Sequence, residues 1–129
     1  MVIMRLDIEI WVKQALADVK TAENCFKAGD YYACAFFSQQ SVEKIMKALF
    51  MLRFRKMPPK IHDLSKLSDL LKLPKYLGSI ARDLTPESIT TRYPDIAGGV
   101  PAELYDKNKA QRILASSMRL LKWLRERVK

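Results

Sequence analysis

The chain has 129 residues, of which 49% are apolar and 29% are charged. This length suits one domain with one core, and the composition excludes a disordered, collagen-like or disulfide-framed chain. Lys and Arg outnumber Asp and Glu by 23 to 14. The resulting net charge of +9 favours an anionic partner, such as nucleic acid, a nucleotide or an acidic protein surface, unless it serves only solubility.

Nothing in the sequence indicates export, a membrane span or a metal site. It holds no secretory signal and no uncharged apolar stretch of about 18 residues, so we expect a cytoplasmic protein that does not enter a membrane. A single histidine and no zinc spacing predict no metal and no cofactor. Cys25 and Cys34 are expected to be free thiols, although a bond between them across a helix–helix turn stays open.

Two long helices are predicted in the first half of the chain. Residues 4–27 carry one apolar stripe at the helical period, and Gly29 is well placed to end this helix. Asp30 can then cap a second helix over residues 31–53. The first part of that helix is apolar on nearly every side, so we expect it to be either the centre of a bundle or half of a dimer interface.

Shorter helices and a loop are predicted in the second half. Apolar periodicity predicts helices over residues 62–72 and 75–84, and a final long helix over 106–127. Prolines and glycines make 85–104 an irregular loop, and a loop this long is usually functional or mobile. No segment alternates with the period of a strand. The chain is therefore predicted to be a single all-α domain over 1–129, an up-and-down bundle of four to five helices with a long loop before the last helix.

The second predicted helix contains the segment Phe37–Leu49, in which two glutamines precede an apolar-Glu-Lys run and then Lys-Ala-Leu. His62-Asp63-Leu64 and Thr91-Arg92-Tyr93-Pro94-Asp95 follow. This ordered set spans nearly the whole chain and resembles the HEPN family, named for nucleotide binding in higher eukaryotes and prokaryotes. The resemblance implies a helical bundle that is commonly a homodimer. It also implies frequent pairing with a minimal nucleotidyltransferase in toxin–antitoxin modules.

Four residues are candidates for binding a nucleotide or another anion: Lys44, Lys47, Arg92 and Tyr93. An arginine can hold a phosphate with two parallel hydrogen bonds, and a tyrosine can stack on a base. Such residues can instead have purely structural roles. Lys47 follows Glu43 by four residues and can pair with it, and Arg92 can clamp the loop through a carboxylate. Gln39 and Gln40 are expected to form hydrogen bonds in the core or at an interface.

Two basic clusters can together attract phosphate. The first is Lys44, Lys47, Arg53, Arg55, Lys56 and Lys60; the second, in the last helix, is Lys107, Lys109, Arg112, Arg119, Lys122, Arg125, Arg127 and Lys129. If the fold joins them into one face, that face binds phosphate backbones in a salt-dependent way. Otherwise they are simply solvated surfaces.

Arg55 and His62 raise the possibility of ribonuclease activity. Ribonuclease members of the family use an arginine, a short spacer and a histidine, and six residues separate Arg55 from His62 here. The pair falls before the third helix rather than near the final ones, however, and Leu64 stands where modified members carry a tyrosine. We therefore predict a non-catalytic protein, in which His62 caps or packs the third helix. A metal-independent ribonuclease using Arg55 and His62 across a dimer, and a ligand-free helical interaction module, are the alternatives.

Overall fold

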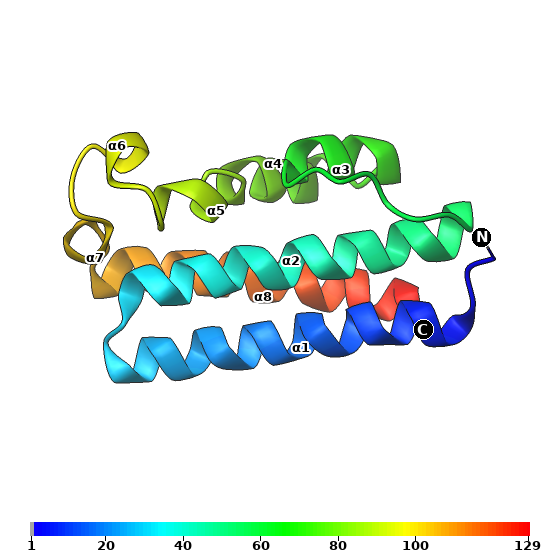
Figure 1. Cartoon of the computed structure of the whole chain (residues 1–129), viewed down its shortest axis with the longest axis horizontal. Coiled ribbons are helices and arrows are strands. Elements are labelled where there is room, and N and C mark those ends of the chain that lie inside the picture. Colours follow the sequence, from blue (N-terminus) through cyan, green and yellow to red (C-terminus); the bar gives the residue numbers. More distant parts are fainter. Residues whose placement is uncertain (1) are drawn as a thin grey trace.

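The computed structural model describes residues 2–129, and within them it contains helices and no strand. Three long helices, α1 (Arg5–Ala28), α2 (Tyr31–Phe54) and α8 (Lys107–Val128), pack side by side. Figure 1 shows that α2 and α8 run in one direction and α1 in the other. The shorter helices α3 (Leu64–Leu71), α4 (Lys75–Leu84) and α5 (Glu87–Thr90) follow one another back along the bundle as a broken fourth limb (Figure 1). The predicted up-and-down bundle is confirmed.

The segment predicted as a long loop, 85–104, holds three helices of one turn each. These are α5, α6 (Pro94–Ala97) and α7 (Pro101–Leu104), joined by short bends at the end of the bundle from which α8 starts (Figure 1). Proline stands at the first position of α6 and α7, where its missing N–H costs no hydrogen bond. The prolines predicted an irregular loop, but in the structure two of them begin short helices.

Helix α2 is the central element, as its apolar surface predicted. It contacts α1, α8, α3, α5 and α7. Its buried side chains include Ile45, Met46 and Leu49, which share one core with Leu67 of α3 and Leu120 of α8. Burying each such side chain contributes roughly 1.5–3 kcal/mol. A helix surrounded in this way has a fixed position, so polar side chains along it are held in a fixed frame.

The helix ends confirm one predicted cap and correct another. Gly29 ends α1 with a φ of 83°, in the left-handed region that favours glycine. Asp30 does stand before α2, but its side chain accepts no capping hydrogen bond. Asp63 rather than His62 caps α3, because its carboxylate accepts bonds from the backbone N–H groups of Ser65 and Lys66. His62 does not cap α3, and its ring contacts Glu43 of α2 instead.

Both cysteines are free thiols. Burial raises the pKa of Cys34 to about 11, and it also raises the pKa of Cys25. Neither is therefore a ready thiolate at neutral pH. Over residues 2–129, no group of acidic, histidine and cysteine side chains is arranged to hold a metal ion. No helix in that range is both long and apolar enough to cross a membrane.

Candidate functional site

A buried carboxylate on α2 organises the polar centre of the molecule. Glu43 is 5% exposed, and Lys47 Nζ lies 3.2 Å from its Oε2 atom, as the predicted ion pair requires. Gln39, which is fully buried, donates to Oε1 from 3.3 Å. Positions 39, 43 and 47 are four apart and so share one face of the helix. A buried charge needs such partners, because an unpaired one is strongly destabilising.

The hydrogen bonds continue from this carboxylate across to α1. Gln40 donates to Oε1 of Gln39 at 2.8 Å, and Lys44 donates to Oε1 of Gln40 at 3.2 Å. Lys44 also forms an ion pair with Asp18 of α1, which in turn accepts from Gln14 at 3.0 Å. The predicted partners for the two glutamines are thus present. This polar chain fixes α1 against α2, and it neutralises both lysines that were candidates for anion binding.

His62 joins the same carboxylate from the linker before α3. Its Nδ1 atom lies 3.0 Å from Oε2 and 3.2 Å from Oε1 of Glu43, while its side chain remains 71% exposed. An ionised carboxylate only accepts, so Nδ1 carries the hydrogen in this contact. In the neutral ring, Nε2 then keeps a free lone pair. A carboxylate that orients an imidazole in this way is the arrangement that general-base histidines use.

Arg55, the other residue of the predicted ribonuclease pair, lies apart from this site. It ends α2 with a φ of 55° and its side chain is exposed. Arg55 stands twelve positions after Glu43 along α2, a rise of roughly 18 Å. No hydrogen bond or ion pair joins its side chain to any residue among 2–129. Within one chain, therefore, Arg55 and His62 are not brought together.

Arg92 has no carboxylate partner among residues 2–129. Its Nε donates to the backbone oxygen of Ser88 at 2.6 Å, and its guanidinium lies 5.1 Å from the ring centre of Phe36 and 5.2 Å from that of Tyr93. The clamp expected for this residue therefore uses a carbonyl and two aromatic rings, and no ion pair forms with any described residue. Tyr93 is 47% exposed. An exposed guanidinium can bind a phosphate, and the exposed aromatic ring beside it can stack on a base.

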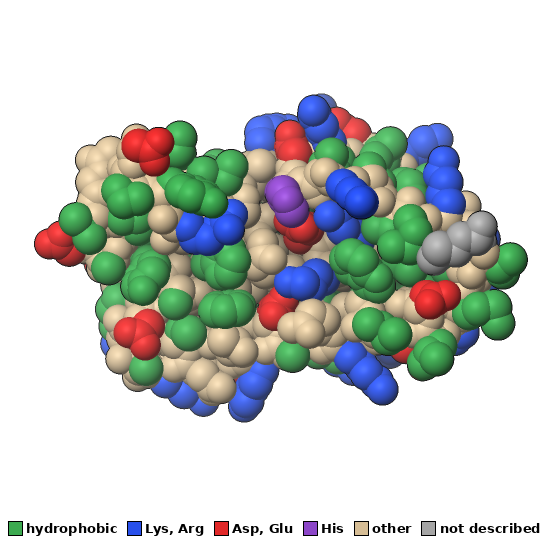
Figure 2. All heavy atoms as spheres, in the orientation of Figure 1, with side chains coloured by type: hydrophobic (Ala, Val, Ile, Leu, Met, Phe, Trp, Pro, Cys, Tyr) green, Lys and Arg blue, Asp and Glu red, His purple; other side chains and the backbone are tan. Residues whose placement is uncertain are grey.

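The helical period places Arg92 and His62 on one side of α2. Phe36, which lies beneath Arg92, precedes Glu43, which holds His62, by seven residues, or two turns. Phe36 and Glu43, the α2 residues that contact Arg92 and His62, are therefore separated by a rise of roughly 10 Å along the helix axis. Figure 2 shows the histidine on this face among basic and acidic side chains, with an apolar area over α5–α7. We call this surface, defined by Phe36, Lys44, His62, Arg92 and Tyr93, the α2 face.

A second buried carboxylate positions the segment that carries Arg92. Glu87 on α5 accepts a hydrogen bond from the hydroxyl of Tyr105, just before α8, and Lys109 Nζ lies 4.2 Å from the Tyr105 ring centre. Burial raises the pKa of Glu87, although the Tyr105 bond opposes this, and burial also raises the pKa of Tyr105. This pair ties α5 to the start of α8. Nothing in the local sequence indicated it, because residues 87 and 105 are joined only by the fold.

Most residues of the two basic clusters are exposed at the surface. Lys47 is buried, whereas Arg53, Arg55, Lys56 and Lys60 are exposed near the end of α2. All the basic residues of α8 except the half-buried Lys109 are exposed too. Because α2 and α8 run in the same direction, the C-terminal residues of both clusters lie at the same end of the bundle (Figure 1).

Comparison with known proteins agrees with this fold and its sequence motifs. The HEPN domain family matches residues 8–127. The crystal structure of TT1696 from Thermus thermophilus superposes with a TM-score of 0.82 at 28% identity, covering 93% of this chain and 97% of that one. ST0689, an archaeal HEPN homologue, gives a TM-score of 0.81 at 30% identity, covering 95% and 98%. No curated protein matched. The resemblance found in the sequence is confirmed, and the chain belongs to the HEPN domain family.

Proposed function

We propose that this HEPN protein binds a nucleotide or single-stranded RNA on the α2 face without catalysing a reaction. The observation that carries the proposal is the position of Arg92, whose guanidinium lies close to the rings of Phe36 and Tyr93 and has no carboxylate partner among the described residues. A phosphate can complete its hydrogen bonding, and a base can stack on the exposed ring of Tyr93. The net charge of +9 adds long-range attraction for such a ligand.

The candidate residues divide into two roles in this proposal. Arg92 and Tyr93 contact the ligand directly. Lys44 is paired with Asp18 and only 23% of its side chain is exposed, so it adds a weaker contact at the edge. Lys47 is buried against Glu43 and shapes the surface from below. His62 has an exposed ring and is held two helical turns further along α2 than Arg92, so it contacts the next phosphate or ribose along a strand.

The second part of the proposal is the biological setting. We propose that the protein works as a homodimer with a minimal nucleotidyltransferase, in a toxin–antitoxin-like module. Support for this part comes from membership of the family and from the exposed basic surface, which suits an acidic partner protein. Co-expression with the nucleotidyltransferase of a neighbouring gene, followed by size-exclusion chromatography with light scattering, tests it. Separate elution of the two proteins would contradict this part while leaving ligand binding open.

Binding to the α2 face is tested by fluorescence anisotropy with a labelled single-stranded RNA and by calorimetry with mononucleotides. Arg92→Ala and Tyr93→Ala are expected to weaken binding, while Lys20→Ala, which removes an exposed charge from α1, is expected to change it little. Equal weakening by all three variants would indicate unspecific charge attraction. No binding of either probe would leave a helical interaction module as the function.

The contact between Glu43 and His62 favours one alternative, a metal-independent ribonuclease. The carboxylate orients the imidazole, and the free Nε2 could accept a proton from a ribose hydroxyl. In this alternative, Arg55 would have to come from a second copy of the chain, because it does not reach His62 in its own. Incubation of RNA with the purified protein and EDTA separates the two functions. Cleavage that His62→Ala abolishes would establish the ribonuclease and end the non-catalytic proposal.

A further inference from the structure

A groove runs between α1 and α8, away from the α2 face. It consists of two adjoining hollows, the larger about 440 Å³ in volume, which share Arg125 and Lys129 as lining residues. Its floor is apolar and comes from both helices: Val12, Leu16, Val19, Met118, Leu121 and Val128. We call it the α1–α8 groove. Met118 leaves 43% of its surface exposed within it.

The groove and the polar chain that leads to Lys44 of the α2 face use opposite sides of α1. Gln14 and Asp18, which belong to the polar chain, are four residues apart on one side of that helix. At 100° per residue, Val12 and Leu16 fall on the other side. Substitutions in the groove should therefore leave the α2 face unchanged, and substitutions on the α2 face should leave the groove unchanged.

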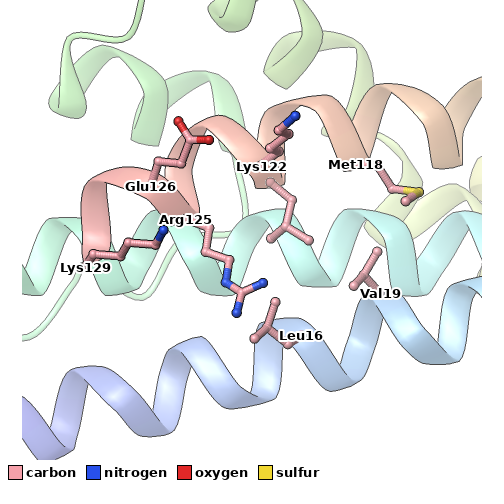
Figure 3. Close-up of a pocket in the computed structure, with 8 residues that line it drawn as sticks. Leu16, Val19, Met118, Lys122, Arg125, Glu126 and Lys129 are labelled. Atoms are coloured by element: carbon pink, nitrogen blue, oxygen red, sulfur yellow. The ribbon is translucent and has the colours of Figure 1, made fainter.

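The charges around the groove are mostly basic. Five basic and two acidic residues line it. One of the acids, Glu9, is 3.4 Å from Arg5 and so is already paired. Lys13, Arg125 and Lys129 form no ion pair with any residue among 2–129. Figure 3 shows Arg125 reaching from α8 toward Leu16 of α1, whereas the carboxylate of the other acid, Glu126, points away from α1.

The dimensions of the groove match a helix. On α1 the lining residues extend from Arg5 to Val19, a rise of roughly 21 Å, which equals about four helical turns. Two parallel ridges with an apolar channel between them are the surface into which a third helix lays its apolar stripe. None of the described residues that line the groove is aromatic, so it offers no platform on which bases could stack.

We propose that the α1–α8 groove binds an amphipathic helix of a partner protein, with an apolar stripe flanked by acidic residues. The stripe covers Leu16, Val19 and Met118. The acidic side chains pair with Lys13 on α1 and Arg125 on α8, which form no ion pair with any residue among 2–129. Charge complementarity selects this partner, because a second copy docked groove to groove would place one set of basic lining residues against another.

The test uses a labelled synthetic peptide of about 15 residues, long enough for four turns. Leucines stand at the i, i+3, i+4 and i+7 positions and glutamates elsewhere. Fluorescence anisotropy is expected to show saturable binding. A peptide of the same composition in scrambled order, which has no stripe, should bind at least about tenfold more weakly.

Protein variants place the binding in the groove. Arg125→Glu is expected to weaken binding of the striped peptide at least about tenfold, and Met118→Glu similarly. Lys107→Glu makes the same charge change as Arg125→Glu at the far, exposed end of α8 and should leave affinity within about twofold. Circular dichroism melts confirm that each variant is folded. Because Met118 is exposed, its variant keeps the test usable if Arg125→Glu fails to fold.

Three outcomes would overturn the proposal. The first is equal binding of the striped and scrambled peptides. The second is equal loss in Arg125→Glu and Lys107→Glu, which would indicate unspecific attraction. The third is displacement of the bound peptide from wild type by single-stranded RNA, together with RNA binding that Arg125→Glu weakens and Arg92→Ala does not, which would make the groove a nucleic-acid surface. Arg92→Ala should leave peptide binding unchanged, so this proposal and RNA binding at the α2 face can fail separately.

Discussion

The Nδ1 atom of His62 lies 3.0 Å from a carboxylate oxygen of Glu43, so an exposed ring from the linker is tied to a buried charge on the central helix. The same carboxylate neutralises Lys47 and accepts from Gln39. One side chain therefore determines both the stability of the α2 interior and the orientation of a surface imidazole.

Glu43→Gln is expected to destabilise the protein by about 3 kcal/mol, because it leaves the ammonium group of Lys47 buried without a counter-charge. Urea unfolding followed by circular dichroism measures the change. Glu9→Gln removes an exposed ion pair and serves as the matched control, with a loss below about 1 kcal/mol. Similar losses in the two variants would mean that the Glu43 pair is no more important than a surface pair.

Arg92→Ala is expected to weaken RNA binding and also to flatten its salt dependence. Each phosphate contact that is lost lowers the slope of log K against log salt by about 0.7 for a single strand. Anisotropy titrations at several salt concentrations measure the slope. Arg92→Lys keeps the charge but not the paired hydrogen bonds, so it should restore the slope while recovering only part of the affinity. An unchanged slope in Arg92→Ala would show that Arg92 does not contact a phosphate.

Glu87 is expected to make stability depend on pH. Burial raises its pKa in the folded protein above the ordinary value of 4.5, so the folded state binds the proton more tightly than the unfolded chain. Its contribution is then fully present below the unfolded pKa and is lost as pH rises through the folded pKa. Glu87→Gln should remove this dependence, so the stability of wild type relative to the variant falls from acidic to neutral pH. Parallel stability curves for the two proteins would contradict the assignment.

The two aspartates that precede helices should differ in their contribution to stability. Asp63→Ala is expected to cost about 1 kcal/mol, because the Asp63 carboxylate accepts from two backbone N–H groups at the start of α3. Asp30→Ala should cost less than about 0.5 kcal/mol, since the Asp30 side chain makes no capping bond. Thermal melts of both variants measure the difference. A larger loss for Asp30 would reverse this ranking.

Periodicity was sufficient to predict the five longer helices, because apolar stripes and the Gly29 stop are local features. The bounds of the structure differ from those predictions by at most two residues at any end. The one-turn helices of 85–104 were not predicted, since a four-residue helix is too short to show a period. The Asp30 cap failed for a related reason. A suitable residue type does not determine the backbone angles that bring its oxygen to an N–H.

The candidate site was less predictable than the fold. The pair of Glu43 and Lys47 lies within one helix and could be read from its spacing. The contacts of Glu43 with His62, of Lys44 with Asp18, and of Arg92 with Phe36 join distant parts of the chain. Only the packing of α1, α5 and the linker before α3 against α2 brings these residues together. Sequence could therefore identify the lysines as candidates and pair Lys47 with Glu43, but it could not reveal that Asp18 of α1 neutralises Lys44.

The short helix α6 has no buried residue, and it begins two residues after Arg92. Local opening of such a segment costs little free energy, so its amide hydrogens should exchange with deuterium before those of α2. A ligand held by Arg92 and Tyr93 would restrict this motion. The conformational entropy lost in this way would offset part of the interaction energy. Slower exchange in residues 93–98 when ligand is present would thus report occupancy of the α2 face, even for a ligand that leaves the helices unmoved.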